Sequence, residues 1–544
     1  MDSKPFESFT SLLAVLDAKY ERDRVALTFY RGKTRMGRLT YGELLDRVHG
    51  LSGYLQAALD VHPGDRILIL APNRLEIPVL LLALMRIGAV VVPLNPTATP
   101  EDWKYIARHS EAKGLIATRE LQDRFGQNDP DFEFTLDIDE LSGFSGKIPD
   151  SIPKLKAVAE IHSDELAIVL YTSGTTGNPK GVGLSQRNLL ANAWSMALNF
   201  NLMQTTQFAV LPLYHAHALG FGLMTSLITG GHLVFTDKMD PFAWAEIIRG
   251  ESVSFTSVVP NLLSLLLAAR VHREKVPTLK SILVSSAPLS VEQARDFETK
   301  TGIPLIQGWG LSEYTNFACC LSPTDTPEDH RALLFSPEGS SIGSPLTGTE
   351  VRVIDEKGQE APEGMNGELC VRGHSLMLAY YRDFEATRNT LHNGWLRTGD
   401  QGLFRRYQGK PVFFITGRIK EIIIRSGEKY SPLAIEKKIC DLAPEFVGKL
   451  VVVGFSHRLQ GEEIGAYLET DHLTDPLRDR LTKTIEALPI ELRPKVILCS
   501  STPIPRTHTG KIQRRKLHSL FSKFDDCRGA LKIETVENEV RVDG

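Results

Sequence analysis

The sequence predicts an α/β protein with two parts. A large N-terminal domain, made of two α/β layers and a β-rich subdomain, is followed by a small α+β domain. The chain has 544 residues, which is more than a single hydrophobic core usually holds. Short apolar runs alternate with helical patterns up to about residue 340, as is typical of parallel α/β architecture. From Gly343 onward, short strands and glycine turns indicate a β-rich unit.

The N-terminal layers are expected to begin with a strand, a buried helix and a second strand. Residues 77–94 are mostly apolar, but Pro78 and Arg86 interrupt them, whereas a membrane-spanning helix needs roughly 20 clean apolar residues. We therefore predict a buried helix at residues 72–87, which Gly88 turns into a strand. The predicted strands of these layers are residues 66–70, 89–92, 114–117, 208–211, 232–236 and 254–258, and further helices are predicted from about residue 220 and at residues 241–249.

The remaining elements define the predicted domains. Strands of the β-rich subdomain are predicted at residues 350–355, 367–372 and 402–406. The small domain is predicted to contain strands at residues 421–424, 450–455 and 495–500, and helices at residues 432–441 and 476–488. Asp475 is the predicted N-cap of the second helix. We thus expect an N-terminal domain at 1–416, a small domain at 422–525 and a loosely attached polar tail at 526–544. That residues 417–421 form a hinge and that the small domain is mobile is implied by the family resemblance described below.

Composition excludes several classes of protein. The net charge is −4 with both signs interspersed, so no footprint for nucleic acid is expected. Six cysteines in so long a chain, without a C-x-x-C pair, indicate a reducing compartment and neither a zinc site nor a disulfide framework. The first residues lack the pattern of a signal peptide, and the last carry no lipidation address. We therefore expect a cytoplasmic protein without a transmembrane segment, and leave peripheral contact with a membrane open.

A loop at residues 171–181 has the composition of a phosphate-binding segment. It combines hydroxyl side chains, glycines and Lys180 directly after an apolar run. Glycines let backbone N–H groups approach an anion, hydroxyls add donors, and the lysine adds positive charge. The loop is not a Walker motif, because Pro179 stands five residues after Gly174 and Gly181 follows the lysine. A flexible Ser/Gly linker is the alternative interpretation.

Four further clusters make the case for nucleotide chemistry specific. They are QGWGLSE at residues 307–313, WLRTGD at 395–400, GRIKE at 417–421 leading to Ser426 and Gly427, and PRTHTGK at 505–511. Together with the loop, and in this order, they resemble the adenylate-forming superfamily of acyl-CoA synthetases, aryl-CoA ligases, luciferases and peptide-synthetase adenylation domains. The resemblance covers nearly the whole chain. It implies an enzyme that uses ATP, Mg²⁺ and coenzyme A to convert a carboxylic acid into an acyl-adenylate and then into a thioester.

The resemblance assigns roles to the phosphate and metal residues. Attack of a carboxylate on the α-phosphate brings anion against anion, so cations and N–H donors must offset the repulsion. Glu313 matches the family's magnesium ligand, and Ser312 replaces the usual threonine but keeps a hydroxyl. The residues implied to hold the departing phosphates are Thr172, Ser173, Gly174, Thr175, Thr176, Gly177 and Lys180.

The nucleoside is expected to lie against another set of matched residues. Trp309, between Gly308 and Gly310, stands where the family usually has a tyrosine that stacks on adenine; a core tryptophan is the alternative. Ala287 and Pro288 match a second adenine wall, although two serines precede them where the family often has glycines. The resemblance implies that Asp400 binds the ribose hydroxyls and that Arg418 helps to fix sugar and phosphate, the alternative for each being a solvated charge.

Catalysis and domain movement are implied for two lysines. Lys511, on a loop of the small domain, would neutralise the carboxylate and the α-phosphate during adenylation. Its alternative is a surface lysine in the basic run 511–516, which is itself expected to be solvated. Lys420 matches the hinge about which the small domain rotates between the two half-reactions.

Residues for the thiol and the acid complete the resemblance. Ser426 and Gly427 match the turn that lines the thiol tunnel, but Ile424 stands where several relatives carry lysine, and Arg425 follows it. His215 matches a histidine that borders and gates the acyl pocket, and we include it among the catalytic candidates. His217 forms a His-x-His pair with it, but no third metal ligand is nearby, so a core histidine is expected.

The sequence specifies the acid least. Segments 215–225 and 256–260 are rich in apolar residues, which suit an acyl chain or an aromatic acid better than an amino acid. The leading hypothesis is therefore a coenzyme A ligase for a medium- or long-chain fatty acid. The alternatives are a ligase for an aromatic acid, an enzyme that loads a carrier-protein thiol, and a nucleotide-binding protein without catalysis.

Overall fold

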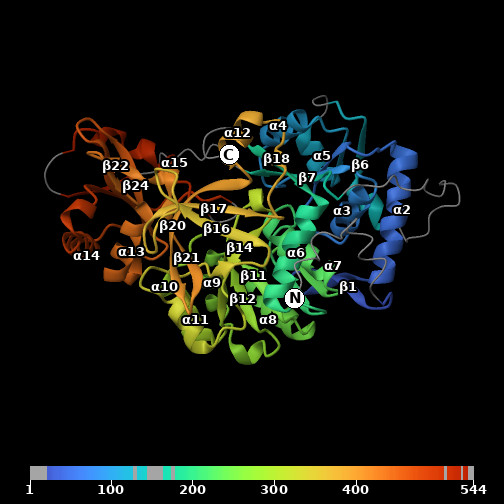
Figure 1. Ribbon diagram of the computed structural model, residues 1–544, viewed down its shortest axis with the longest axis horizontal. Coiled ribbons are helices and arrows are strands. Elements are labelled where there is room, and N and C mark those ends of the chain that lie inside the picture. The colour runs from blue at the N-terminus through green and yellow to red at the C-terminus, as the bar shows by residue number, and fades with distance from the viewer. Residues whose placement is uncertain are drawn as a thin grey trace.

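The computed structural model describes residues 21–126, 131–143, 163–172, 178–507, 511–527 and 531–536. Figure 1 shows a large body and a small one at its end, where helices α13 (Pro432–Leu442) and α14 (Asp475–Glu486) lie in orange and red. The predicted α/β class, with a large N-terminal and a smaller C-terminal domain, is confirmed.

Two sheets build the large body. The seven-stranded sheet has the order β18-β8-β7-β4-β3-β5-β6, and the nine-stranded sheet has the order β15-β14-β13-β12-β11-β9-β10-β1-β2. The strands of the first are β3 (Arg66–Leu70), β4 (Val90–Pro93), β5 (Gly114–Ala117), β6 (Phe134–Asp137), β7 (Leu166–Thr172), β8 (Lys180–Ser185) and β18 (Ala379–Tyr380). Those of the second are β1 (Val25–Arg31), β2 (Thr34–Thr40), β9 (Thr206–Ala209), β10 (His232–Thr236), β11 (Phe255–Val258), β12 (Ser281–Val284), β13 (Leu305–Gly310), β14 (Phe317–Cys320) and β15 (Ser344–Pro345).

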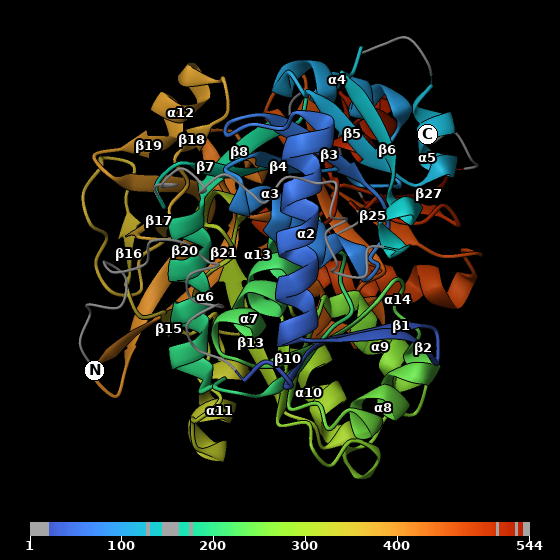
Figure 2. The same ribbon diagram turned by 90° about the vertical axis from the view of Figure 1, so that its right-hand side faces the viewer.

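Helices fill the space between the two sheets and cover their outer faces. One core combines α2 (Tyr41–Leu59), α3 (Glu76–Arg86) and α6 (Gln186–Phe200) with strands of both sheets. Figure 2 shows α2 running from the neighbourhood of β3 to that of β1. The outer helices are α4 (Pro100–Ser110) and α5 (Arg119–Phe125) on one sheet and α8 (Pro241–Gly250), α9 (Pro260–Ala268) and α10 (Val291–Thr301) on the other. The two predicted α/β layers are therefore present.

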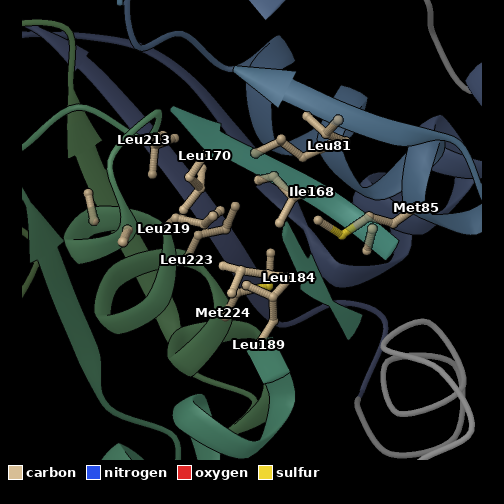
Figure 3. Close-up of a cluster of buried hydrophobic side chains, with 14 of the residues drawn as sticks. Leu81, Met85, Ile168, Leu170, Leu184, Leu189, Leu213, Leu219, Leu223 and Met224 are labelled. Atoms are coloured by element: carbon tan, nitrogen blue, oxygen red, sulfur yellow. The ribbon is translucent and has the colours of Figure 1, made fainter. Parts of the chain in front are cut away.

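The helix predicted from about residue 220 begins as a π-helix. This segment, η3 (Ala218–Met224), runs into α7 (Thr225–Ile228). Leu219, Leu223 and Met224 of η3 point into the cluster formed by β7, β8 and α3 (Figure 3). A Cβ added at Gly220 would lie 2.8 Å from Nδ2 of Asn316, so only glycine permits this close approach. Wide π-turns inside helices occur frequently at functional sites.

Two smaller sheets follow. The β-rich subdomain contains β16 (Thr349–Ile354), β17 (Gly367–Gly373), β19 (Leu391–His392), β20 (Trp395–Tyr407) and β21 (Lys410–Arg418). The small domain contains β22 (Ile423–Arg425), β23 (Glu428–Tyr430), β24 (Leu450–His457), β25 (Gly461–Glu469), β26 (Val496–Ser500) and β27 (Lys532–Thr535). The remaining helices are α11 (Pro327–Leu334), α12 (Phe384–Thr390) and α15 (Arg515–His518).

Two local predictions in the small domain were wrong. Helix α14 starts at Asp475, and its N-cap is Thr474, whose side chain accepts from the N–H of Leu477. The polar tail is not loosely attached throughout, because β27 pairs in parallel with β26 from Lys532↔Val496 onward. Backbone hydrogen bonds thus hold residues 532–535 in the sheet, although their composition alone predicts a solvated segment.

Two predictions from composition can be compared with the structure. All six cysteines are buried and free of disulfide bonds. None of the helices that the structure describes is both long and apolar enough to cross a membrane.

Candidate active site

Strand pairing brings the predicted ribose and adenine residues together. Asp400 on β20 lies opposite Arg418 on β21, and the Nε of Arg418 is 3.1 Å from Oδ1 of Asp400. Trp309, at the end of β13, donates its indole N–H to Oδ2 of the same carboxylate over 2.9 Å. The charge of Asp400 is the largest cause of the raised pKa of Arg418. Trp309 is only 8% exposed; its stacking role stays a prediction.

A second acidic residue, which sequence reasoning missed, holds the Asp400 strand in place. Glu368 is 8% exposed and accepts from the N–H of Gly399 at 3.0 Å and from Nε of Arg397 at 2.7 Å. The N–H of Asp400 itself donates to Oγ1 of Thr398. A carboxylate fixed by its neighbours on both sides is preorganised to accept ribose hydroxyls.

The predicted metal ligand Glu313 is positioned by a tyrosine that the sequence did not reveal. Tyr380 on β18 donates its hydroxyl to Oε1 of Glu313 over 2.9 Å. Burial first, and the charge of Glu313 second, raise the pKa of Tyr380. Nζ of Lys180 lies 5.1 Å from the centroid of the Tyr380 ring, a cation–π distance. Tyr380 therefore connects the predicted metal ligand with the predicted phosphate lysine.

The donor set around Glu313 fits Mg²⁺. Within the described ranges, no three His, Cys, Asp or Glu side chains come together in a way that could hold a metal ion. Mg²⁺ in nucleotide enzymes is usually held by one or two carboxylates together with substrate phosphates and water. The single, half-buried Glu313 suits that arrangement and would not suit an all-protein metal cage.

The phosphate loop is described only at its two ends. Thr172 ends β7 and Lys180 begins β8, and these two residues face each other in an antiparallel pair. Oγ1 of Thr172 donates to the carbonyl of Lys180 at 3.4 Å. Ser173, Gly174, Thr175, Thr176 and Gly177 lie outside the described residues. The predicted loop thus starts and ends on adjacent strands of the seven-stranded sheet.

Lys511 of the small domain reaches the large-domain site. The pKa of Lys511 is lowered, chiefly because the amine is buried and then because of the charge of Arg418. The carboxylates of Asp400 and Glu313 oppose this shift. The N–H of Lys511 donates to Oγ1 of Thr507 over 3.1 Å, which anchors the start of its loop. The cation thus stands among the predicted ribose, metal and phosphate residues.

The predicted hinge is flanked by a buried arginine. Lys420 lies in η6 (Ile419–Glu421) and is exposed. Glu421 pairs with Nε of Arg514 at 3.0 Å, and the same guanidinium binds Glu436 of α13 through Nη1 and Nη2. Arg514 is 7% exposed. The expectation that the basic run 511–516 is solvated is therefore wrong at this residue, because two carboxylates neutralise it inside the small domain.

The predicted thiol-tunnel residues form a tight turn between β22 and β23. Ser426 and Gly427 both have positive φ, +52° and +85°, and the N–H of Ser426 donates to the carbonyl of Gln460. Arg425 binds Glu463 at 2.8 Å and is 11% exposed. Its guanidinium is therefore held inside the small domain and does not replace the lysine missing at Ile424.

The residues predicted to border the acid lie around the start of η3. His215 is half-buried, with its ring centroid 4.4 Å from that of Tyr214. His217 is buried, as expected, and its Nδ1 lies 3.2 Å from Oγ of Ser286. Its Nε2 has no hydrogen-bond partner among the described residues, so it is not the satisfied core histidine that was expected. Ser286 has φ +72°, a left-handed conformation that explains why the family often has glycine before Ala287 and Pro288.

Comparison with known proteins agrees with this geometry. The family described as "AMP-binding enzyme" matches residues 16–381. A sulfoacetate–CoA ligase from Cupriavidus necator is 31% identical over 94% of this chain and 97% of its own length. A long-chain-fatty-acid–CoA ligase from Bacillus subtilis is 26% identical, with 94% of each chain covered. The ATP-bound structure of MatB from Rhodopseudomonas palustris superimposes with a TM-score of 0.82 at 25% identity, covering 95% of this chain and all of that one.

The family match spans well over half of the chain, and the motif order, the fold and the Lys511 placement lead to the same class. The chain belongs to the AMP-binding enzyme family and is an AMP-forming acid–thiol ligase.

Proposed function

We propose that this enzyme joins a carboxylic acid to coenzyme A in two steps at one site. In the first step a carboxylate oxygen attacks the α-phosphorus of ATP, the bond to pyrophosphate breaks, and acyl-AMP forms. In the second step the thiol attacks the acyl carbon, AMP leaves and a thioester forms. The observation that supports this proposal is that Lys511, from the small domain, lies close enough to Arg418, Asp400 and Glu313 for their charges to shift its pKa.

The residues around Lys511 account for the adenylation step. Its ammonium offsets the repulsion between the carboxylate and the α-phosphate, and it stabilises the charge that builds on the phosphoryl oxygens. Lys180 and the loop between β7 and β8 would hold the departing pyrophosphate. ATP, coenzyme A and Mg²⁺ are used by enzymes of this class, and Glu313, oriented by Tyr380, would hold the Mg²⁺ that screens the phosphates.

Asp400 retains capacity for the ribose. Each oxygen of its carboxylate already accepts one hydrogen bond or ion pair, from Arg418 at Oδ1 and from Trp309 at Oδ2. A carboxylate has about four lone-pair sites, so both ribose hydroxyls can still donate to it. The role proposed for Arg418 is to hold the carboxylate in position and to approach the phosphate.

The thiol step requires the small domain to turn. Lys511 must leave the site once acyl-AMP has formed, so that the turn at Ser426 and Gly427 can approach. Rotation about Lys420 is proposed for this exchange. Ser431 donates its hydroxyl to the carbonyl of Thr416 over 2.6 Å, and this bond across the hinge would break on rotation.

The proposal does not restrict the substrate to a fatty acid. The hypothesis of a medium- or long-chain fatty acid rested on apolar residues in segments 215–225 and 256–260. Leu219, Leu223 and Met224 pack into the core between the two sheets, and Phe221 and Val258 pack into the second core. Packing in the core accounts for the apolar character of these side chains, so this character does not by itself favour a fatty acid. Fatty, aromatic and short polar acids all remain in the test.

A carrier-protein thiol is the second candidate acceptor. Ile424 is 49% exposed at a position where several relatives have lysine, and Arg425 is held by Glu463. Strand β22 thus offers no free cation to the phosphates of coenzyme A. This feature favours a thiol carried by a protein as the acceptor.

Mass spectrometry of products tests the proposal. The purified enzyme is incubated with ATP, Mg²⁺ and a panel of fatty, aromatic and short polar acids, with and without coenzyme A. Acyl-CoA together with AMP is the expected result. Acyl-AMP that accumulates without a thioester would favour the carrier-protein acceptor. ATP binding without any AMP formation across the panel would contradict the proposed function.

A further inference from the structure

Two residues at the edge of the site have strained backbones. Ser286 and Thr315 adopt positive φ values of +72° and +64°, which are rare for residues with a side chain and rarest for β-branched ones. Such strain persists where the surrounding structure requires it, and it is concentrated at ligand sites. Each of the two carries or positions a polar side chain at the same helix, η3.

The strain at Ser286 serves His217. With this backbone, the Ser286 hydroxyl reaches Nδ1 of His217, and the N–H of Ser286 donates to Oγ of Ser285. Ser286 therefore fixes the orientation of the imidazole ring of His217.

The strain at Thr315 serves Asn316. Thr315 lies at the centre of a tight turn in which the N–H of Asn316 donates to the carbonyl of Tyr314 over 2.7 Å. The carbonyl of Asn316 accepts from the N–H of Leu311 over 2.9 Å. This turn presses the Asn316 amide against Gly220 of η3.

Both polar side chains are buried with one nitrogen unpaired. His217 is 7% exposed and Asn316 is 5% exposed. Nε2 of His217 and Nδ2 of Asn316 have no hydrogen-bond partner in the part of the chain that the structure describes. An unpaired buried polar group is costly, and native proteins rarely retain one without a reason.

The two unpaired nitrogens belong to one junction. His217 and Gly220 stand one turn apart at the start of η3, and Gly220 contacts Asn316. The ring of Phe317, the next residue after Asn316, packs edge-on against His217 with centroids 5.0 Å apart. Ser286 precedes the predicted adenine wall, and Asn316 follows Glu313 by three residues. The junction therefore adjoins, along the chain, both the predicted adenine wall and the predicted metal ligand, and in the proposed function the acid would approach the nucleotide there.

The junction offers hydrogen bonds without charge. Burial lowers the pKa of His217 to about 3, so the imidazole is neutral at physiological pH. The Ser286 hydroxyl can rotate to donate or accept, so Nε2 can serve as acceptor or donor. The amide of Asn316 is a donor at Nδ2. An alkyl chain would leave both nitrogens unpaired, and a second anionic group would lack a cation from this pair.

We propose that His217 and Asn316 select an acid that carries an uncharged oxygen, a hydroxyl or carbonyl group, near its carboxylate. This inference rests on the proposed function and specifies its acid. Sites built to hydrogen-bond a substrate hydroxyl can reject the analogue that lacks it by about 10⁴-fold, because the buried groups then stay unpaired.

Matched pairs of acids test the inference. Pyrophosphate release is measured as kcat/KM for hexanoic against 3-hydroxyhexanoic and 3-oxohexanoic acid, and for 3-phenylpropanoic against 3-hydroxy-3-phenylpropanoic acid. The oxygen-bearing member of at least one pair is expected to be preferred by 100-fold or more. Equal kcat/KM within every pair would overturn the inference and leave the ligase proposal intact.

Three variants identify the groups responsible. Asn316→Leu and His217→Phe should lower kcat/KM for the preferred oxygen-bearing acid at least 10-fold while sparing its plain partner. Ser286→Gly relieves the positive φ, so it should fold, and it should weaken the preference as a change in the KM of that acid. An unchanged preference in all three would mean that the nitrogens bind only water, and would contradict the inference.

Gln207→Leu is the matched control. Gln207, near the start of β9, is 1% exposed, and neither amide atom finds a partner within the described chain. Because Gln207 lies outside the site, its substitution should leave the preference unchanged.

A binding measurement separates this inference from the ligase proposal. The shift in Tm caused by each acid is recorded with a non-hydrolysable ATP analogue, without turnover. Larger shifts for the oxygen-bearing acids would support the inference even if no thioester formed. Equal shifts within every pair would overturn it.

Discussion

On the nucleotide side of the site the carboxylate of Asp400 is paired with two neighbouring side chains, whereas two polar side chains proposed for the acid side are only partly paired. Asp400 already accepts from Trp309 and lies against Arg418. His217 and Asn316 each keep one nitrogen without a partner among the residues described. The first arrangement is held in place before any ligand binds and keeps lone pairs for the ribose, as suits a nucleotide that is the same in every cycle. In our proposal the second is completed by the acid, as suits a group that discriminates between acids.

The largest expected effect comes from removing the cation that the small domain brings to the nucleotide side. Lys511→Ala should lower ATP-driven adenylation by about 10³-fold, because charge stabilisation in the transition state is lost. Thioester formation from supplied acyl-adenylate should be spared. Pyrophosphate release and thioester formation are measured separately.

Lys516→Ala is the control for this variant, since Lys516 is exposed in the same basic run. If Lys511→Ala slowed both half-reactions equally, the alternation of domains would be refuted.

Removing one partner from a fully paired group should cost stability. Arg514→Met leaves Glu436 buried without its guanidinium, and burial already raises the pKa of that carboxyl. We expect a loss of about 3 kcal/mol, as for other broken buried ion pairs, seen as a lower Tm. Arg515→Met, at an exposed neighbour, should leave the Tm unchanged; an equal fall in both variants would argue against a specific role of the buried pair.

The acid side should make stability depend on pH. The pKa of His217 falls to about 3 in the folded chain, against about 6.5 when unfolded. The unfolded chain therefore binds more protons below pH 6.5, so His217 contributes full stability above that pH and loses it as the pH falls toward 3. Between pH 7.5 and 5.0 this costs about 2 kcal/mol. His217→Phe should flatten that slope in denaturant titrations, and an unchanged slope would contradict burial of a neutral imidazole.

A smaller effect is expected for the indole on the nucleotide side. Trp309→Phe removes the N–H that binds Asp400, which should cost about 1 kcal/mol and raise the KM for ATP about fivefold. Trp244→Phe is the matched control, because Trp244 is buried in α8 and its N–H has no partner within the described ranges. Equal KM values for both variants would mean that the Trp309 hydrogen bond does not position Asp400.

The smallest effect should come from an unpaired amide outside the site. Gln207→Leu should change stability by less than about 0.5 kcal/mol or raise it, since no hydrogen bond is broken. Asn188→Leu is the contrasting variant, because Asn188 donates to the carbonyls of His374 and Leu376 and bonds Ser185 at the N-cap of α6. If Gln207→Leu lowered the Tm more than Asn188→Leu did, the distinction between paired and unpaired groups would be contradicted.

The local motifs of the site could be predicted from the sequence, but the residues that hold those motifs in position could not. The motifs around Trp309, Asp400 and Arg418 are short contiguous runs whose order and spacing identified the family. Tyr380 and Glu368 were missed because each acts on a residue about 30 or more positions away, through strand pairing that the sequence does not display. A buried tyrosine next to Ala379 gave no local signal.

Segments with ambiguous composition were also hard to predict. Residues 532–535 are polar and charged, and only the free edge of β26 explains why they form a strand. Arg514 stands among exposed basic residues, and only the fold reveals the two carboxylates beneath it. Apolar residues of η3 were expected at the acyl pocket, but apolar character alone does not tell a core-facing side from a ligand-facing side.

The two ion pairs on either side of the predicted hinge limit the number of residues about which the small domain could rotate. Arg418 is tied to the large body through Asp400, and Glu421 is tied to the small domain through Arg514. Only Ile419 and Lys420 lie between these two anchors, and both are exposed. If the small domain swings between half-reactions, nearly all of the torsion must be absorbed by the φ and ψ angles of two residues. The small domain would then rotate about one short axis through a defined angle, and would not move freely as on a flexible linker.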